Sequence, residues 1–157
     1  MPISAKDVSA GISEEHRGYF LLQMGNLDDA YLPVIKALWE AIGEFSPFVR
    51  HLQPTIIILD VRPFTMVTPL RTLTWDPKPH VAHTCIEHMI FIDIAGMAKL
   101  KHAFMVTAFL EELVHAVMNI ADEPLTKTIV TTIYPKVIFL NGQYRERPGM
   151  IISKRIV

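Results

Sequence analysis

Helical and alternating patterns of hydrophobic residues divide much of the chain into predicted elements. In residues 30–45, AYLPVIKALWEAIGEF, apolar side chains recur every three or four positions, which is typical of an amphipathic helix. Asp28 or Asp29 precedes this segment as a candidate cap, and Pro33 is tolerated in a first helical turn. The run PTIIILDV at 54–61 is short, apolar and β-branched, so it predicts a mostly buried strand.

The middle of the chain predicts further strands. Residues 64–75 contain Pro69, which restricts this segment to an edge strand or to two short strands. In residues 86–95, IEHMIFIDIA, every second residue from Ile86 to Ile94 is isoleucine except His88, so these residues would share one face of a strand. The residues between them would form the other face, and we therefore expect one strand. Gly96 then breaks the pattern.

Two helices and a hairpin are predicted after this strand. Residues 97–121 contain no glycine or proline and are rich in good helix formers, so they predict the longest helix of the chain. Asp122 is placed to cap a second helix at 124–134, which begins with a proline. Residues 136–147 form two extended runs around an Asn-Gly pair, the strongest short signal for a β-hairpin.

Length and composition predict a single domain whose net charge does not favour binding to nucleic acid or to an anionic membrane. A chain of 157 residues has the size of a single α+β domain, which we expect over residues 1–157, with 145–157 as a basic tail. The formal net charge of −1 provides no long-range field that would attract nucleic acid or an anionic membrane. Because half of the residues are hydrophobic, we expect part of the surface to contact a protein or peptide partner, or other copies in an oligomer or larger assembly.

The cysteine content, the first residues and the length of the apolar runs predict a cytoplasmic location. Cys85 is the only cysteine, so no internal disulfide can form and no oxidising compartment is indicated. The first twenty residues lack the positive start and apolar run of a secretory signal. The most apolar run, residues 103–110, is far shorter than the roughly 20 residues that a membrane span needs.

Residues 111–115, EELVH, carry the main chemical signal. Positions four apart on a helix lie on one face, so Glu111 and His115 project together, with Glu112 beside both. A carboxylate and an imidazole at this spacing can chelate a divalent ion, and a neighbouring carboxylate can hold a metal-bound water. Apolar residues surround these glutamates, and burying them without partners would be costly, so the spacing alone does not fix their exposure.

This motif and its setting resemble the zincin family of metallopeptidases, whose motif is HExxH. The resemblance covers residues 30–125: a helix, a small sheet whose late strand is IFID, a motif-bearing helix, and acidic residues after it. It implies a minimal zincin-like α+β domain, in which the small sheet packs on the long motif-bearing helix and a C-terminal β-hairpin follows. It also implies a divalent metal cofactor and hydrolysis of peptides.

The resemblance assigns roles to residues by their positions in the motif. Glu111 takes the place of the first histidine ligand, Glu112 that of the catalytic general base, and His115 that of the second histidine ligand. Asp122 and Glu123 are then the candidates for the third metal ligand.

Glu111 is a departure from the family pattern. Ligation by two carboxylates and a histidine would neutralise both charges of the metal, so the metal would lower the pKa of its bound water less. Carboxylate ligands also shift the preference from zinc toward manganese or iron(II). The sequence therefore predicts a metal-dependent hydrolase of metallopeptidase type with a degenerate site. Two alternatives are open: a non-catalytic assembly or interaction protein on a zincin-like scaffold, or an accidental grouping of helix residues.

A second group of histidines, around Cys85, is a weaker candidate for a zinc site. His80, His83 and His88 lie near Cys85, but on a strand His83 and Cys85 share a face while His88 points the opposite way. No helix N-terminus or basic cluster follows Cys85, so we expect a small buried hydrophobe and not a nucleophile. The proline-containing loop at 75–80, WDPKPH, is a candidate for partner contact.

Overall fold

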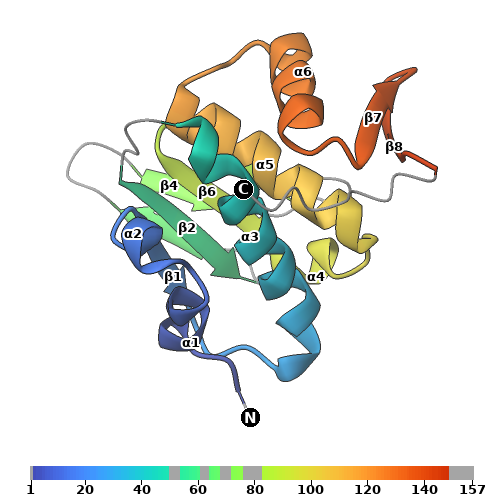
Figure 1. Cartoon of the computed structure of the whole chain (residues 1–157). Coiled ribbons are helices and arrows are strands. Elements are labelled where there is room, and N and C mark those ends of the chain that lie inside the picture. The colour runs from blue at the N-terminus through green and yellow to red at the C-terminus, as the bar shows by residue number, and fades with distance from the viewer. Residues whose placement is uncertain (1, 50–53, 61–63, 68–71, 76–82, 149–157) are drawn as a thin grey trace.

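The chain folds as a mixed α+β structure (Figure 1), which confirms the predicted class. The computed structural model describes residues 2–49, 54–60, 64–67, 72–75 and 83–148. Its helices are α1 (Ala5–Ala10), α2 (Glu14–Arg17), α3 (Leu32–Phe45), α4 (Ile94–Met97), α5 (His102–Met118) and α6 (Glu123–Ile133), with 3₁₀ turns at Asp29–Tyr31 and Ser46–Phe48. Its strands are β1 (Phe20–Met24), β2 (Thr55–Asp60), β3 (Phe64–Val67), β4 (Thr72–Trp75), β5 (His83–Ile86), β6 (Met89–Asp93), β7 (Val137–Leu140) and β8 (Gln143–Glu146).

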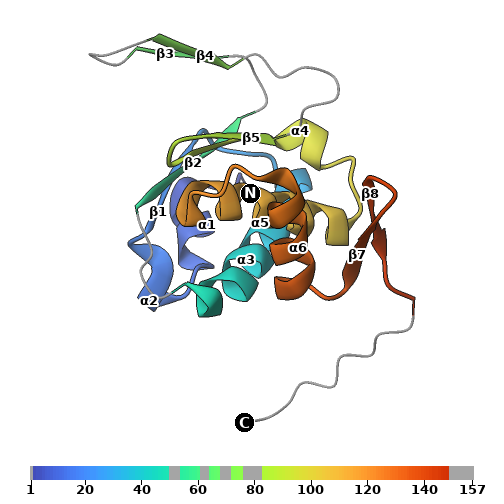
Figure 2. The same ribbon diagram turned by 90° about the horizontal axis from the view of Figure 1, so that it is seen from above.

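A four-stranded sheet with the order β1-β2-β6-β5 organises the fold. Strands β1, β2 and β6 are parallel, and β5 runs antiparallel to β6 at one edge of the sheet. Figure 2 shows α3 and α5 beneath one face of this sheet, with α6 and the β7–β8 hairpin beyond α5. The β3–β4 hairpin projects away from the sheet in the same view.

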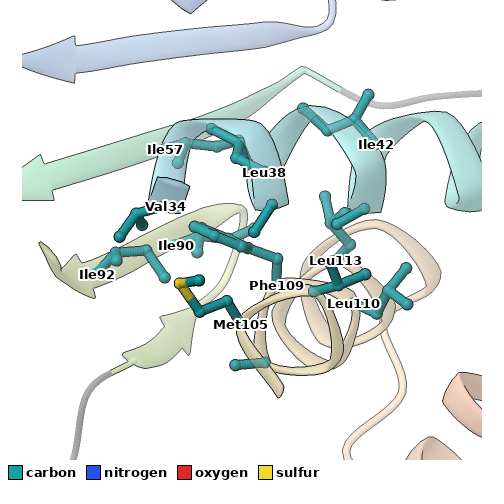
Figure 3. Packing of buried hydrophobic residues seen from close by; sticks show 14 of the residues in the cluster. Val34, Leu38, Ile42, Ile57, Ile90, Ile92, Met105, Phe109, Leu110 and Leu113 are labelled. Atoms are coloured by element: carbon teal, nitrogen blue, oxygen red, sulfur yellow. The ribbon is translucent and has the colours of Figure 1, made fainter. Parts of the chain in front are cut away.

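The core lies between the sheet, α3 and α5. Figure 3 shows side chains from all three pointing toward one another: Ile57, Ile90 and Ile92 from the sheet, Val34, Leu38 and Ile42 from α3, and Met105, Phe109, Leu110 and Leu113 from α5. Each of these side chains is buried, and removing one from water contributes about 1.5–3 kcal/mol. Most of α5 is buried, and Glu111 and Glu112 are among its buried residues. The central helix therefore brings two carboxylates into the interior.

Local sequence signals correctly predicted several elements. Helix α3 follows a 3₁₀ turn in which the Asp28 carboxylate accepts a hydrogen bond from the Ala30 N–H at 2.8 Å. Strand β2 lies within the predicted run, and β3 and β4 are two short strands on either side of the proline. The β7–β8 hairpin turns at Asn141 and Gly142, whose φ angles of 53° and 77° lie in the left-handed region.

The prediction of one strand over residues 86–95 is wrong. Strand β5 ends at Ile86 and β6 begins at Met89, and Glu87 adopts a positive φ of 56° in the tight turn between them. After β6, the Asp93 carboxylate accepts a hydrogen bond from the Ala95 N–H at 3.1 Å and caps α4. The glycine at 96 therefore lies inside a short helix and does not break the strand.

The longest helix is shorter than the predicted 97–121. Helix α5 begins at His102 and ends at Met118, because Asn119 adopts the left-handed conformation that commonly terminates helices. Met97 belongs to α4. The N-terminal elements α1, α2 and β1 had no counterpart in the predicted pattern.

No single helix in the described part of the chain is long and apolar enough to cross a bilayer. Helices α5 and α6 reach that length and composition only as a pair, and the two are bent by 116° where they join.

Candidate functional site

The three polar residues of EELVH line one pocket. This β5–α5 pocket has a volume of about 490 Å³ and lies between the edge strand β5, the C-terminal half of α5 and the first turns of α6. Among the described residues, the charged side chains that line it are Glu87, Glu111, Glu112, Glu123 and Lys127. Two histidines, one from β5 and one from α5, also line it.

Glu111 is held by two donors from outside its own helix. Glu111 is 7% exposed, and its carboxylate accepts a hydrogen bond from the Tyr144 hydroxyl at 2.6 Å and forms an ion pair with the Lys127 ammonium. Lys127 also lies 3.2 Å from the Glu123 carboxylate, one helical turn before it. Burial alone would lower the pKa of Lys127, but the hydrogen bonds and charges of Glu111 and Glu123 raise it above its ordinary value. The ammonium is therefore charged at neutral pH and neutralises a buried carboxylate.

Glu112 is only half satisfied. The residue is 5% exposed, and its carboxylate Oε1 lies 2.5 Å from the His83 Nδ1 on β5. Its Oε2 is buried and has no hydrogen-bond partner in the described part of the chain. A buried carboxylate oxygen without a donor is destabilising, so native structures rarely keep one without a reason.

His115 is oriented by the end of its own helix. Its Nδ1 lies 2.6 Å from the Ile120 carbonyl oxygen, which accepts the ring N–H, and its Nε2 lies 3.4 Å from Glu123. Because Asn119 ends α5 in the left-handed conformation, the chain reverses and brings the Ile120 carbonyl back to the ring.

The two candidate third ligands have different places. Glu123 lines the pocket between Lys127 and His115. Asp122 is exposed, lies outside the pocket lining, and its carboxylate accepts a hydrogen bond from the Leu125 N–H at 2.7 Å. Asp122 thus caps α6, as its position before the proline indicated.

Replacing Asp122 with alanine is expected to lower the free energy of unfolding by about 1 kcal/mol, because α6 loses its N-cap. Asp122→Asn keeps a capping oxygen and is expected to retain most of that stability. Urea denaturation of both variants measures the difference. If the asparagine variant were destabilised as much as the alanine variant, the role of Asp122 would depend on its charge and not on capping.

The arrangement of these residues does not fit a divalent metal ion. Among the described residues, no three histidine, cysteine, aspartate or glutamate side chains converge as a ligand set would. The Lys127 ammonium lies between Glu111 and Glu123, which are two of the predicted metal ligands, and it pairs with both carboxylates. A metal ion would have to displace this ammonium, so metal binding at Glu111, His115 and Glu123 stays a prediction.

The described members of the second histidine group do not assemble either. His88 Nδ1 lies 2.9 Å from the Ala116 carbonyl oxygen, and the Cys85 thiol donates to the Glu87 carbonyl at 3.2 Å. His83 instead contacts Glu112. His80, and the predicted partner loop after Trp75, lie outside the described residues.

Cys85 is expected to react slowly with alkylating reagents. Burial and the negative charge of Glu112 raise the pKa of its thiol to about 12, so at pH 8 it holds roughly a thousandfold less thiolate than an ordinary thiol. Carboxamidomethylation by iodoacetamide should therefore be at least about a hundredfold slower in the folded chain than in urea. Glu112→Gln should accelerate it. Equal rates in the folded and unfolded chain would show that the thiol is not suppressed by this environment.

Sequence reasoning missed the cation of the pocket. Lys127 had one local signal, its position four residues after Glu123 on a predicted helix. Tyr144 and the contact between His83 and Glu112 join distant parts of the chain, so no local pattern indicates them.

Comparisons with known proteins add no assignment to this site. No protein-family model matches the chain, and neither does any curated protein or solved structure. The resemblance to zincins therefore depends on EELVH and the order of elements.

Proposed function

We propose that the chain is a non-catalytic interaction protein on a zincin-like scaffold, and that it binds an extended peptide segment along β5 and in the β5–α5 pocket. The observation that carries this proposal is the Lys127 ammonium between Glu111 and Glu123. This ammonium supplies the positive charge of the site from within the chain. Unlike a catalytic metal, it offers no open coordination position at which water can be activated.

The edge strand supports a peptide as the partner. Among the described strands, β5 is the last of the sheet, and an edge strand presents backbone N–H and C=O groups to an added strand. All four of its side chains are partly exposed, and His83, Thr84 and Cys85 also line the pocket. An extended segment paired with β5 would therefore place alternate side chains over the pocket.

A second candidate function is metal-dependent hydrolysis of the metallopeptidase type. It is favoured by the orientation of His115, whose Nδ1 donates to the Ile120 carbonyl oxygen while its Nε2 faces the Glu123 carboxylate. A histidine that binds a metal through one ring nitrogen commonly donates from the other in this way. The unpartnered oxygen of Glu112 also suits this function, in which the resemblance to zincins makes Glu112 the general base. This function requires displacement of the Lys127 ammonium, so the metal content of the protein distinguishes the two candidates.

Peptide selection tests the leading proposal. A phage-displayed random heptapeptide library would be selected on the immobilised full chain in the presence of EDTA, and the enriched peptides synthesised. In each peptide, one of the two alternating sets of backbone nitrogens would be methylated at a time, and we call each set a phase. We expect binding to fall at least about tenfold when one phase is methylated and little when the other is, because edge pairing uses alternate N–H groups.

The two methylation phases are matched controls for each other, since they change hydrophobicity equally. Failure to enrich any peptide, or equal loss in both phases, would overturn binding along β5. Cleavage of the enriched peptides after addition of a divalent metal would favour the second candidate.

A further inference from the structure

We infer that the β5–α5 pocket accepts a cationic side chain of the bound segment, a guanidinium or an ammonium, with Glu112 Oε2 as its acceptor. This inference rests on the proposed function and names the chemistry that the same site selects. It depends on the charge of the pocket and on one buried atom.

The described lining of the pocket carries an excess of negative charge. Among the described residues, Glu111, Glu112 and Glu123 line it with one lysine, and that lysine already pairs with Glu111 and Glu123. His83 and His115 each lie beside one carboxylate and do not reach the others in the described contacts. A concave site with like charges and low-dielectric walls attracts cations and repels anionic side chains.

The unpartnered oxygen locates the acceptor. Glu112 is 95% buried, lines the pocket, and directs Oε1 to His83, while Oε2 has no donor among the described residues. Because Oε2 is buried, the carboxylate must turn toward the pocket to accept a hydrogen bond from a ligand, and that bond would remove the cost of leaving Oε2 unsatisfied. Charge-assisted hydrogen bonds of this kind are among the strongest in proteins.

An organic cation fits this site better than a metal ion. A guanidinium or ammonium needs one or two acceptors and can lie beside the Lys127 ion pair, whereas a metal ion needs several converging ligands, which are not assembled among the described residues. The planar guanidinium, with donors on two edges, matches a carboxylate best.

Binding of a fragment pair tests the inference without any choice of peptide. N-butylguanidine and N-butylurea have nearly the same shape, but only the first is charged at neutral pH. We would titrate each into the ¹⁵N-labelled full chain in EDTA at physiological salt and follow amide shifts. We expect the guanidine to bind at least about tenfold more tightly than the urea, with shifts concentrated at β5 and the second half of α5.

Two variants sharpen the assignment to Glu112. Glu112→Gln should reduce guanidine binding at least about tenfold. Glu15→Gln changes the net charge equally at a side chain that is 85% exposed and outside the pocket lining, so it should leave binding unchanged. The wild-type comparison of guanidine and urea needs no variant, so it decides the question even if Glu112→Gln fails to fold.

The outcomes separate this inference from the proposed function. Equal binding of guanidine and urea, or binding only with added divalent metal, would overturn the cation site even if neutral peptides still pair with β5. Guanidine binding without any enriched peptide would keep the cation site and overturn the peptide function. If both hold, replacing arginine with citrulline in the enriched peptides should weaken them at least about tenfold.

Discussion

Replacing Lys127 with methionine is expected to lower the free energy of unfolding by about 3 kcal/mol, because Glu111 then becomes a buried carboxylate without its cation. The loss should lie at the low end of the range for broken buried ion pairs, since the Tyr144 hydroxyl still donates to Glu111. Methionine keeps most of the side-chain length and apolar surface, so the change tests the charge. Urea denaturation at pH 7 measures it.

A surface lysine provides the matched control. Lys101 is 76% exposed and lies 3.5 Å from Glu146, so Lys101→Met should change stability by less than about 0.5 kcal/mol. Combining Lys127→Met with Glu111→Gln should recover part of the loss, because the uncompensated charge is removed. Equal effects of the two lysine variants would mean that the Glu111–Lys127 pair does not hold the pocket together.

Truncating Phe109 to alanine is expected to have a larger effect, a loss of about 4 kcal/mol in the free energy of unfolding. Phe109 is 1% exposed and points from α5 into the space between the sheet and α3 (Figure 3). The rigid elements on three sides cannot close a ring-sized cavity, so both burial and packing are lost. A thermal melt should show a decrease of roughly 10 °C in the midpoint.

An exposed phenylalanine tests whether this loss comes from burial. Phe48 is 55% exposed after α3, so Phe48→Ala should cost less than about 1 kcal/mol. A similar cost for the two alanine variants would contradict the packing of α5 between the sheet and α3.

The predictable part of the fold is the part with local signals. Helix α6 begins with a capping aspartate and a proline, and the β7–β8 hairpin contains an Asn-Gly turn, so short stretches of sequence specify both. The turn between β5 and β6 contains Glu87 at a positive φ, where glycine or asparagine is usual. The alternation of isoleucines continues through that turn, so the pattern indicated one strand instead of two.

The candidate site follows the same division. Glu111, Glu112 and His115 were placed together by helical spacing, and the structure brings them with Glu123 into one pocket. The partner that defines the site, Lys127, comes from the next helix, and its contact with Glu111 depends on how the two helices pack. The burial of both glutamates likewise follows from tertiary packing and not from the motif.

Metal content tests the central claim most directly, the claim that the Lys127 ammonium is the cation of this site. The protein would be purified without added metal or chelator, and wild type and His115→Ala would be compared by mass spectrometry for zinc, manganese and iron. We predict far less than one equivalent of any of these metals in the wild type, and no difference in the variant. Near-stoichiometric metal in the wild type that is lost in His115→Ala would contradict the proposal and favour a metal-dependent hydrolase.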